Sequence, residues 1–169
     1  KGIGISNSVR NFQDPNEKNE LLCAIGSGFH ILKGFRHPRE IYVLLDALKI
    51  DFINPLIAQL HGANEVTTLK NFFSGLMKLP HQEKQKILNL VISRLPDLGD
   101  EPAYRWTKIL SYKFPGDIGV VIPMVLQYFF LKEGDAVFLP AGEVHSYLKG
   151  TGLEIMNNSD NVIRGGLTK

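Results

Sequence analysis

The residues between Gly134 and His145 combine two turns with a side chain that can bind a metal ion. Gly134 favours a turn into a strand, and Pro140 ends the hydrogen-bond ladder of that strand. Gly142 permits a second tight turn, in a backbone conformation that other residues adopt only at a cost. The chain then returns as a strand that carries His145, and imidazole is the commonest side-chain ligand of metal ions. In this arrangement the side chain of His145 can point into the mouth of a β-barrel, where it could bind a metal ion.

The same segment resembles the second conserved motif of the cupin superfamily. That motif is a Gly, five residues, a Pro, any residue, a Gly, two residues and a His, and the chain matches it from Gly134 to His145. Many members of the superfamily end the motif with an Asn, where this chain has Lys149. The match favours His145 as a metal ligand over a core or surface histidine, provided that the structure supplies the context.

Two further segments resemble signatures of one cupin family, the type I mannose-6-phosphate isomerases. Residues 159–168 read SDNVIRGGLT, and the family has Ser-Asp-Asn, an Arg and Gly-Leu-Thr at this place. Residues 10–20 read RNFQDPNEKNE, which is similar to a family segment with Asp-Pro-Asn, a Lys and then a Glu. The motifs stand in the family's order with a helical insertion between them, so the resemblance spans nearly the whole chain.

The resemblance implies a zinc cofactor and a small sugar phosphate as the partner of the protein. By position, Glu20 and His145 correspond to zinc ligands, and Arg164 corresponds to the arginine assigned to catalysis. The implied reaction interconverts mannose 6-phosphate and fructose 6-phosphate through an enediol. Four polar residues correspond to residues that line the family's pocket: Lys18, Tyr147, Glu154 and Asp160.

These residue types suit an aldose–ketose isomerisation. The reaction moves a proton between two adjacent carbons of the sugar, and negative charge develops on an oxygen. A zinc ion can polarise that oxygen as a Lewis acid, and an arginine can stabilise the enediolate with fixed donors. A carboxylate or a lysine with a shifted pKa can carry the proton, but the sequence does not identify that base.

Each candidate also has a simpler interpretation. Glu20 on its own fits a solvated carboxylate at the edge of a strand. Arg164 fits a surface cation, although Gly165 and Gly166 after it indicate backbone kept clear for a ligand. The other candidates fit structural, loop or turn residues: Lys18, Tyr147, Glu154 and Asp160.

The chain departs from the family pattern in two ways: two zinc ligands are missing, and single residues of the motifs are replaced. The family's other two zinc ligands, a Gln and a His two residues apart before a Pro, have no counterpart in residues 1–19. A catalytic zinc site usually has three protein ligands, so we expect the isolated chain to bind zinc weakly and to be inactive. Lys169 stands where the family has Pro, and Asn19 stands where Pro is frequent, a change expected to be peripheral. These departures, with Lys1 as the first residue, indicate an internal piece of a longer protein.

Two other functions remain open at this point. The first is a non-catalytic cupin that binds a sugar or regulates, and the presence of both Glu20 and Arg164 argues against it. The second is another cupin metalloenzyme, such as an iron-dependent oxygenase. Such an enzyme usually needs two or three histidines on the barrel strands, and only His145 is well placed.

Three regions of different periodicity predict an α+β fold, in which a β domain is interrupted by a helical insertion, and the resemblance implies that the β domain is a cupin-type β-barrel (jelly roll). Residues 1–36 form part of the first barrel and contain a short apolar run after Glu20, which predicts a buried strand. Residues 37–114 form a helical domain, in which three runs of apolar side chains at helical spacing and a fourth candidate at residues 102–113 predict four helices. Residues 115–169 return to the barrel, with short strands predicted at residues 127–131 and 136–139 as a hairpin, and then at 147–148, 153–156 and 161–163.

Composition narrows the class of protein further. A net charge of +2 does not provide the dense basic surface that nucleic acids require, so a nucleic-acid partner is not expected. No apolar run reaches transmembrane length, so a membrane partner is not expected either. The one cysteine, Cys23, has apolar neighbours and indicates a core residue of a cytoplasmic protein. A monomer is expected. The remaining histidines have no partner at metal-ligand spacing and are expected at the surface: His30, His37, His61 and His81.

Overall fold

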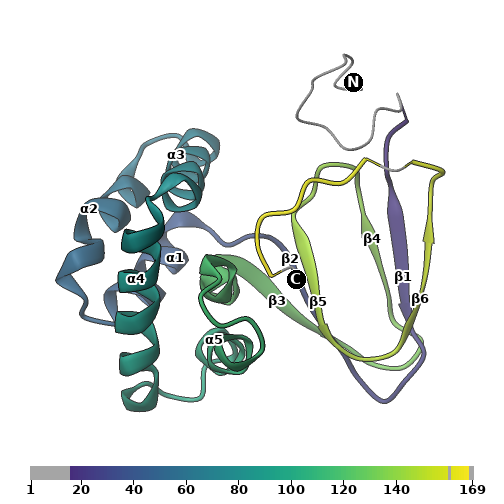
Figure 1. Ribbon diagram of the computed structural model, residues 1–169. Helices are drawn as coiled ribbons and strands as arrows, with labels where there is room; N and C mark the ends of the chain where they lie inside the picture. The colour runs from purple at the N-terminus through teal and green to yellow at the C-terminus, as the bar shows by residue number, and fades with distance from the viewer. Residues whose placement is uncertain (1–15, 160, 168–169) are drawn as a thin grey trace. The chain divides into compact units, whose positions relative to one another are not determined.

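The computed structural model describes residues 16–159 and 161–167 of the chain. These residues divide into a β unit, residues 16–34 with 128–159 and 161–164, and a helical unit, residues 35–127 with 165–167 (Figure 1). The helical unit therefore continues to residue 127, beyond the boundary at 114 that the sequence suggested. The reason is the 3₁₀ segment η4 (Ile118–Met124), which is buried throughout and packs against the last helix.

The helical unit contains the four amphipathic helices that periodicity predicts. They are α1 (Pro38–Asp46), α3 (Glu65–Lys78), α4 (His81–Arg94) and α5 (Pro102–Lys113). The short α2 (Asn54–Ile57) and three further 3₁₀ turns, η1 (Asp51–Ile53), η2 (Ala58–His61) and η3 (Leu95–Asp97), were not predicted, because segments of three or four residues carry no period. Among the described residues, no helix is both long and apolar enough to cross a membrane.

The start of α1 shows how local sequence sets a helix boundary. Pro38 occupies the first turn, where the missing N–H costs nothing. His37 precedes it as the cap: its Nδ1 accepts from the backbone N–H of Arg39 at 3.2 Å, and its own N–H donates to Glu40 Oε2 at 3.0 Å. His37 thus has a structural role as a helix cap.

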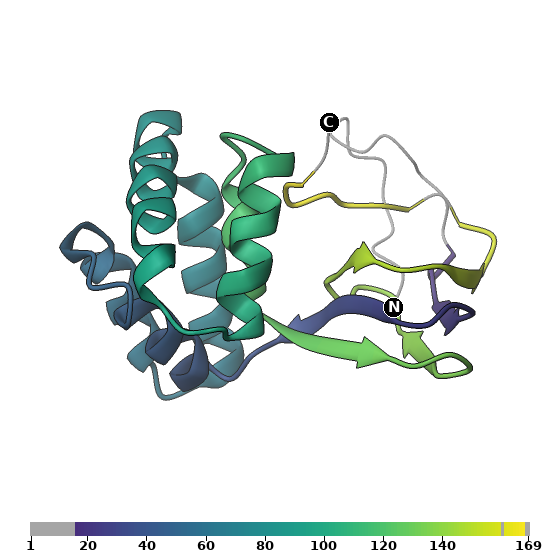
Figure 2. The ribbon, with the colours of Figure 1, turned by 90° about the horizontal axis from the view of Figure 1, so that it is seen from below.

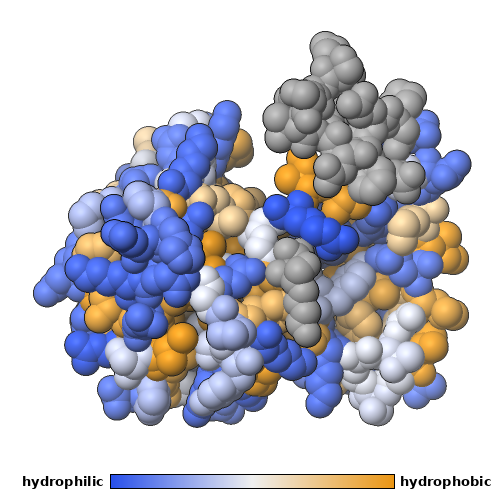
Figure 3. Space-filling model, viewed as in Figure 1, coloured by the Kyte–Doolittle hydropathy of each residue, from blue (hydrophilic) through white to orange (hydrophobic). Residues whose placement is uncertain are grey.

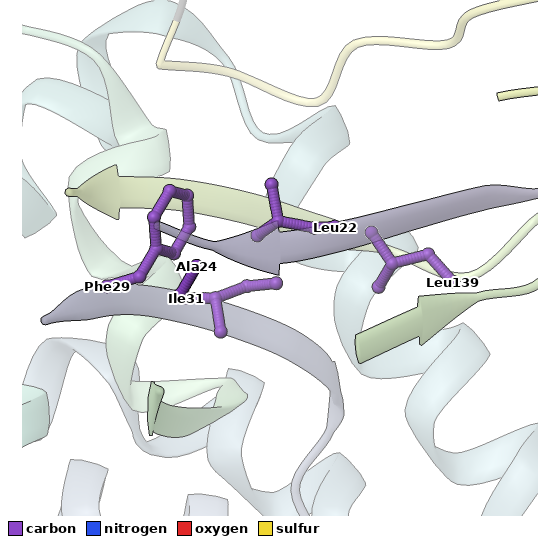
Figure 4. Close-up of a cluster of buried hydrophobic side chains, with 5 residues drawn as sticks. All are labelled: Leu22, Ala24, Phe29, Ile31 and Leu139. Carbon is purple, nitrogen blue, oxygen red and sulfur yellow. The ribbon is translucent and has the colours of Figure 1, made fainter. Parts of the chain in front are cut away.

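The β unit is built from two antiparallel three-stranded sheets that face each other as layers (Figures 1 and 2). The first sheet has the order β4–β1–β6 and the second the order β3–β2–β5. The five side chains of Figure 4 come from both sheets and form the buried core between them: Leu22, Ala24, Phe29, Ile31 and Leu139. The strands are β1 (Glu20–Ala24), β2 (Phe29–Phe35), β3 (Leu126–Leu131), β4 (Ala136–Leu139), β5 (His145–Lys149) and β6 (Gly152–Met156).

The predicted hairpin between β3 and β4 is wrong, although the turn between them exists. The N–H of Asp135 donates to the carbonyl of Lys132 at 3.0 Å, as the sequence indicated. However, the N–H of Gly134 donates to Ala24 O at 2.8 Å, and Asp135 O accepts from Ala24 N at 2.9 Å. The end of β1 therefore captures the chain as it leaves the turn, and β4 joins the other sheet.

The strand predicted at residues 161–163 is also absent, since these residues are irregular in the structure. The backbone N–H of Asn161 donates to Ser159 Oγ at 3.2 Å, and its side-chain amide donates to Asn16 O at 3.2 Å. Short polar side chains compete in this way with a strand ladder for the backbone.

The outward face of the β4–β1–β6 sheet is apolar as well as the inward face. Leu21 lies in register with Phe138 on one side and Ile155 on the other, and all three are exposed, Ile155 to 71%. Leu153, two residues before Ile155 on the same face, is 63% exposed. Figure 3 shows apolar surface in orange along the side of the β unit where β6 lies. Antiparallel sheets with one solvated face usually carry polar residues there.

The two faces of this sheet should differ sharply in their contribution to stability. Leu22 is 2% exposed on the inward face, so Leu22→Ala leaves a cavity and should lower the free energy of unfolding by about 2–5 kcal/mol. The matched control Leu153→Ala lies on the outward face and should change it by about 0.5 kcal/mol or less. Urea unfolding followed by circular dichroism measures both values. Equal losses would show that the sheet faces are assigned wrongly.

Candidate metal centre

Strand β1 directs the carboxylate of Glu20 toward the interior of the β unit. Side chains alternate along a strand, and Glu20, Leu22 and Ala24 are buried while Leu21 between them is exposed. Glu20 itself is 8% exposed. The solvated strand-edge carboxylate that the sequence alone favoured is therefore wrong, because β1 is the central strand of its sheet.

The turn before β5 brings His145 to the same place. The N–H of Glu143 donates to Pro140 O at 3.0 Å and closes the turn, and Gly142 has a φ of +86°, which glycine adopts without strain. His145 is the first residue of β5 and is half-buried. The sequence interpretation of this segment as strand, tight turn and strand is confirmed.

Glu20 and His145 face each other through two electron-pair donors. The distance from His145 Nε2 to Glu20 Oε2 is 3.0 Å. His145 Nδ1 lies 2.9 Å from the backbone carbonyl of Glu143, which can only accept, so the ring proton of a neutral imidazole is on Nδ1 and Nε2 is bare. Within the described part of the chain, the buried Glu20 Oε2 accepts no hydrogen bond. A cation, or a second proton on the imidazole, satisfies this arrangement.

Lys18 approaches the other oxygen of the same carboxylate. Its Nζ lies 3.5 Å from Glu20 Oε1, and both side chains are largely buried. Burial of a carboxylate is unfavourable unless an opposite charge or a hydrogen bond compensates. The ion pair with Lys18 therefore holds one carboxylate oxygen and leaves the other for His145.

Tyr147 and Glu154 form the next layer of the cluster. The Tyr147 ring lies 5.5 Å from the His145 ring, between centroids, and 5.4 Å from Phe29 in an edge-on contact. Its hydroxyl donates to Glu154 Oε1. Burial, followed by the hydrogen bond to Glu154 and the charges of Glu154 and Glu20, raises the pKa of Tyr147 well above its usual range. The tyrosine therefore stays protonated and acts as a donor.

The structure thus brings together five of the seven sequence-predicted site residues. Arg164 is exposed and makes no hydrogen bond or ion pair with the described residues. Asp160 lies outside the described residues. The five that form the cluster are Lys18, Glu20, His145, Tyr147 and Glu154.

Gly166, two residues after Arg164, has a packing role in the helical unit. Gly166 has a φ of +110°, and a Cβ there would lie 3.0 Å from the Cα of Gly119. Asp117 fixes the approach, because its two oxygens accept from the N–H groups of Gly119 and Leu167, each at 2.7 Å. The space beside Gly166 is thus filled by the chain's own backbone, which gives this glycine a packing reason of its own.

Sequence reasoning missed two contacts between distant segments of the chain, one of them beside the site. Asn19 was expected to be peripheral, yet its Oδ1 accepts from the N–H of Ala141 at 3.0 Å. His30 was expected at the surface, yet it is partly buried and its Nδ1 lies 2.7 Å from the Tyr128 hydroxyl. Neither contact has a sequence signal, because each partner is about a hundred residues away.

The cluster offers an incomplete set of metal ligands. Within residues 16–159 and 161–167, no group of three or more His, Cys, Asp or Glu side chains is arranged to hold a metal ion. Glu20 and His145 therefore present two donor atoms, whereas a catalytic zinc ion usually has three protein ligands.

The two facing sheets, the helical unit inserted between their strands and the inward carboxylate–imidazole pair define an α+β protein of the cupin type. Comparison with known proteins narrows this class. The chain is 35% identical over 167 residues to the mannose-6-phosphate isomerase of Escherichia coli K12, covering 99% of this chain and 42% of that enzyme. It is 34% identical over 170 residues to a probable mannose-6-phosphate isomerase of Caenorhabditis elegans, covering 94% and 40%. No family model matches the chain.

Solved structures agree with the sequence matches. A zinc-bound crystal structure of mannose 6-phosphate isomerase superposes with a TM-score of 0.83 at 33% identity, over 96% of this chain and 41% of that one. A point mutant of phosphomannose isomerase from Salmonella typhimurium gives 0.85 at 33% identity, over 96% and 41%. The chain is homologous to mannose-6-phosphate isomerase along nearly its whole length, and it spans about two fifths of the relatives that it matches.

The position of the ring proton on His145 can be tested without any metal. At alkaline pH, nitrogen NMR of the imidazole should show the proton on Nδ1, because the Glu143 carbonyl accepts it there. The exposed His81 serves as the control and should show the Nε2–H form or a mixture. A proton found mainly on Nε2 of His145 would contradict the facing-donor arrangement.

Proposed function

We propose that this chain is the part of a zinc-dependent mannose-6-phosphate isomerase that supplies Glu20 and His145 as two metal ligands. The observation that carries the proposal is the bare Nε2 of His145, held 3.0 Å from a buried carboxylate oxygen that accepts no hydrogen bond from the described residues. The homology to named isomerases and the zinc in a related crystal structure support it.

The donor pair suits zinc by its chemistry and spacing. An ion with bonds of about 2.0–2.2 Å holds two ligand atoms roughly 3.0–3.5 Å apart. Zinc-binding histidines commonly donate their other N–H to a carbonyl or carboxylate, as His145 does to Glu143. When bound, zinc supplies a Lewis acid that polarises an oxygen of the sugar and favours the enediol.

The other residues of the cluster can bind and orient the sugar. The Lys18 ammonium, 3.5 Å from Glu20, adds a positive charge where an electron-rich sugar oxygen would bind. Tyr147 holds the Glu154 carboxylate in one orientation by donating to it, so that the free carboxylate oxygen can accept from a sugar hydroxyl. In this proposal Arg164 stabilises the negative charge of the enediolate and Asp160 contacts the substrate.

Two alternative functions differ from the isomerase: one converts no substrate, and the other uses a different metal ion. A non-catalytic sugar-binding homologue would keep the fold and the donor pair but would convert no substrate. Another cupin metalloenzyme, such as an iron oxygenase, would prefer a donor set richer in histidine than one His and one Glu. The monomeric state and the cytoplasmic location are part of the same proposal, and light scattering of the purified protein tests the first.

The activity is best tested on a longer protein that includes this chain. It should convert mannose 6-phosphate to fructose 6-phosphate, lose turnover with a chelator and regain it with zinc. Arg164→Ala should lower kcat by about 10²–10³-fold, since it removes a donor that meets the charge of the transition state. The control Arg94→Ala changes an exposed arginine in α4 and should leave kcat unchanged. Near-normal turnover of Arg164→Ala would remove Arg164 from catalysis, and no turnover by the zinc-loaded protein would favour the non-catalytic homologue.

Zinc binding by the 169-residue chain tests the two ligands directly. Titration calorimetry should show weak binding, because two protein donors are fewer than zinc sites normally use. Glu20→Gln and His145→Ala should each abolish the measurable heat, while His81→Ala, at an exposed histidine, should not change it. Tight stoichiometric binding that survives His145→Ala would contradict the assignment.

A further inference from the structure

The two donors of the candidate metal site come from strands that share no hydrogen-bond ladder. Glu20 begins β1, which pairs with β4 and β6, whereas His145 begins β5, which pairs with β2 in the other sheet. Strand pairing therefore does not by itself fix the 3.0 Å distance between His145 Nε2 and Glu20 Oε2. The β1–β4 ladder places Leu139 opposite Glu20, so the link to His145 runs through the turn at residues 140–144, and a contact between that turn and β1 would hold the two donors in place.

Asn19 makes that contact immediately before Glu20. Its side-chain Oδ1 accepts from the backbone N–H of Ala141 at 3.0 Å. Its backbone carbonyl accepts from the N–H of Asn157 at 3.0 Å, just beyond the end of β6. The residue before the ligand is thus held from two sides, by its side chain on one side and by its backbone on the other.

The turn at Ala141 transmits this contact to His145. Ala141 lies between Pro140 and Glu143, whose carbonyl and N–H close the turn at 3.0 Å. The carbonyl of Glu143 then accepts from His145 Nδ1 at 2.9 Å and orients the ring. A path of hydrogen bonds and one short turn therefore connects the backbone of Glu20 with the imidazole of His145.

We infer that Asn19 is a positioning residue for the metal site. It holds the start of β1 against the turn before β5, so that the carboxylate of Glu20 and Nε2 of His145 converge on one point. The inference rests on the proposed function, because it assigns Asn19 to the two ligands of that proposal. Hydrogen-bond partners that orient metal ligands typically change metal affinity by about 10–100-fold when they are removed.

Three variants of the 169-residue chain test the inference through its zinc affinity, measured by competition with a chromogenic chelator. Asn19→Ala removes the acceptor and should weaken zinc binding by about 10-fold, the low end of the usual range, because the bond to Ala141 is exposed. Asn19→Asp keeps an oxygen acceptor and should bind within about twofold of the unaltered chain. Gln85→Ala removes a comparable side-chain-to-backbone bond, to Gly116 O in the helical unit, and should leave zinc affinity unchanged.

Hydrogen exchange of the Ala141 amide provides a readout that needs no metal. Exchange should be faster in Asn19→Ala than in the unaltered chain, and Asn19→Asp should restore protection. If Asn19→Ala is less stable as a whole, the Asp variant still separates the two roles, because a stable Asp variant without normal zinc affinity overturns the inference. Unchanged zinc affinity or unchanged Ala141 exchange in Asn19→Ala overturns it as well.

Glu20→Gln and His145→Ala distinguish the failure of this inference from the failure of the proposed function. If neither variant lowers zinc affinity, the proposed metal site is wrong, and the role of Asn19 is overturned with it. If both variants lower the affinity and Asn19→Ala does not, the metal site stands and only the role of Asn19 is overturned.

Discussion

The β unit depends on one carboxylate that points into an apolar interior. Glu20 lies on the same face of β1 as Leu22 and Ala24, and burial of a charge among such side chains is unfavourable unless partners compensate. Lys18 is such a partner for Oε1, whereas Oε2, which faces His145, needs a cation or a second proton on the imidazole. A sheet that only needed stability would carry an apolar side chain at this position. The cost of keeping Glu20 here is the physical reason to regard the cluster as a site.

Local features of this fold could be predicted from the sequence, and pairings between distant segments could not. Four helices and five of the six strands follow from periodicity and from Pro and Gly positions, because these signals act within a few residues. The β3–β4 hairpin was predicted wrongly, although the turn after β3 is present. The strand that follows this turn, β4, pairs with β1 and not with β3. Ala24, more than a hundred residues before the turn, takes the hydrogen bonds that a hairpin would use.

The same limit applies to the site. His145 could be predicted from the spacing of its own turn, and the structure confirms the form of that turn. The inward direction of Glu20 could not be derived from its neighbours, because a Glu before an apolar run fits an exposed strand edge equally well. Asn19 gave no signal, since its partner is a backbone N–H in the turn at Ala141, and any residue other than proline supplies such a group.

Two of the motifs that carried the resemblance contact each other, which gives them a structural reason to occur together. Asn16, from the segment before β1, donates to Asn158 O at 2.9 Å, and its own carbonyl accepts from Ser159 Oγ at 3.3 Å. The two motifs thus hold the chain where it enters β1 and where it leaves β6. With Asn19 bonded to Ala141, the donors are oriented by backbone contacts that need no ion. Zinc affinity in this chain is then limited by the number of donors rather than by their arrangement, and a third ligand from added polypeptide would meet a pair that is already in position.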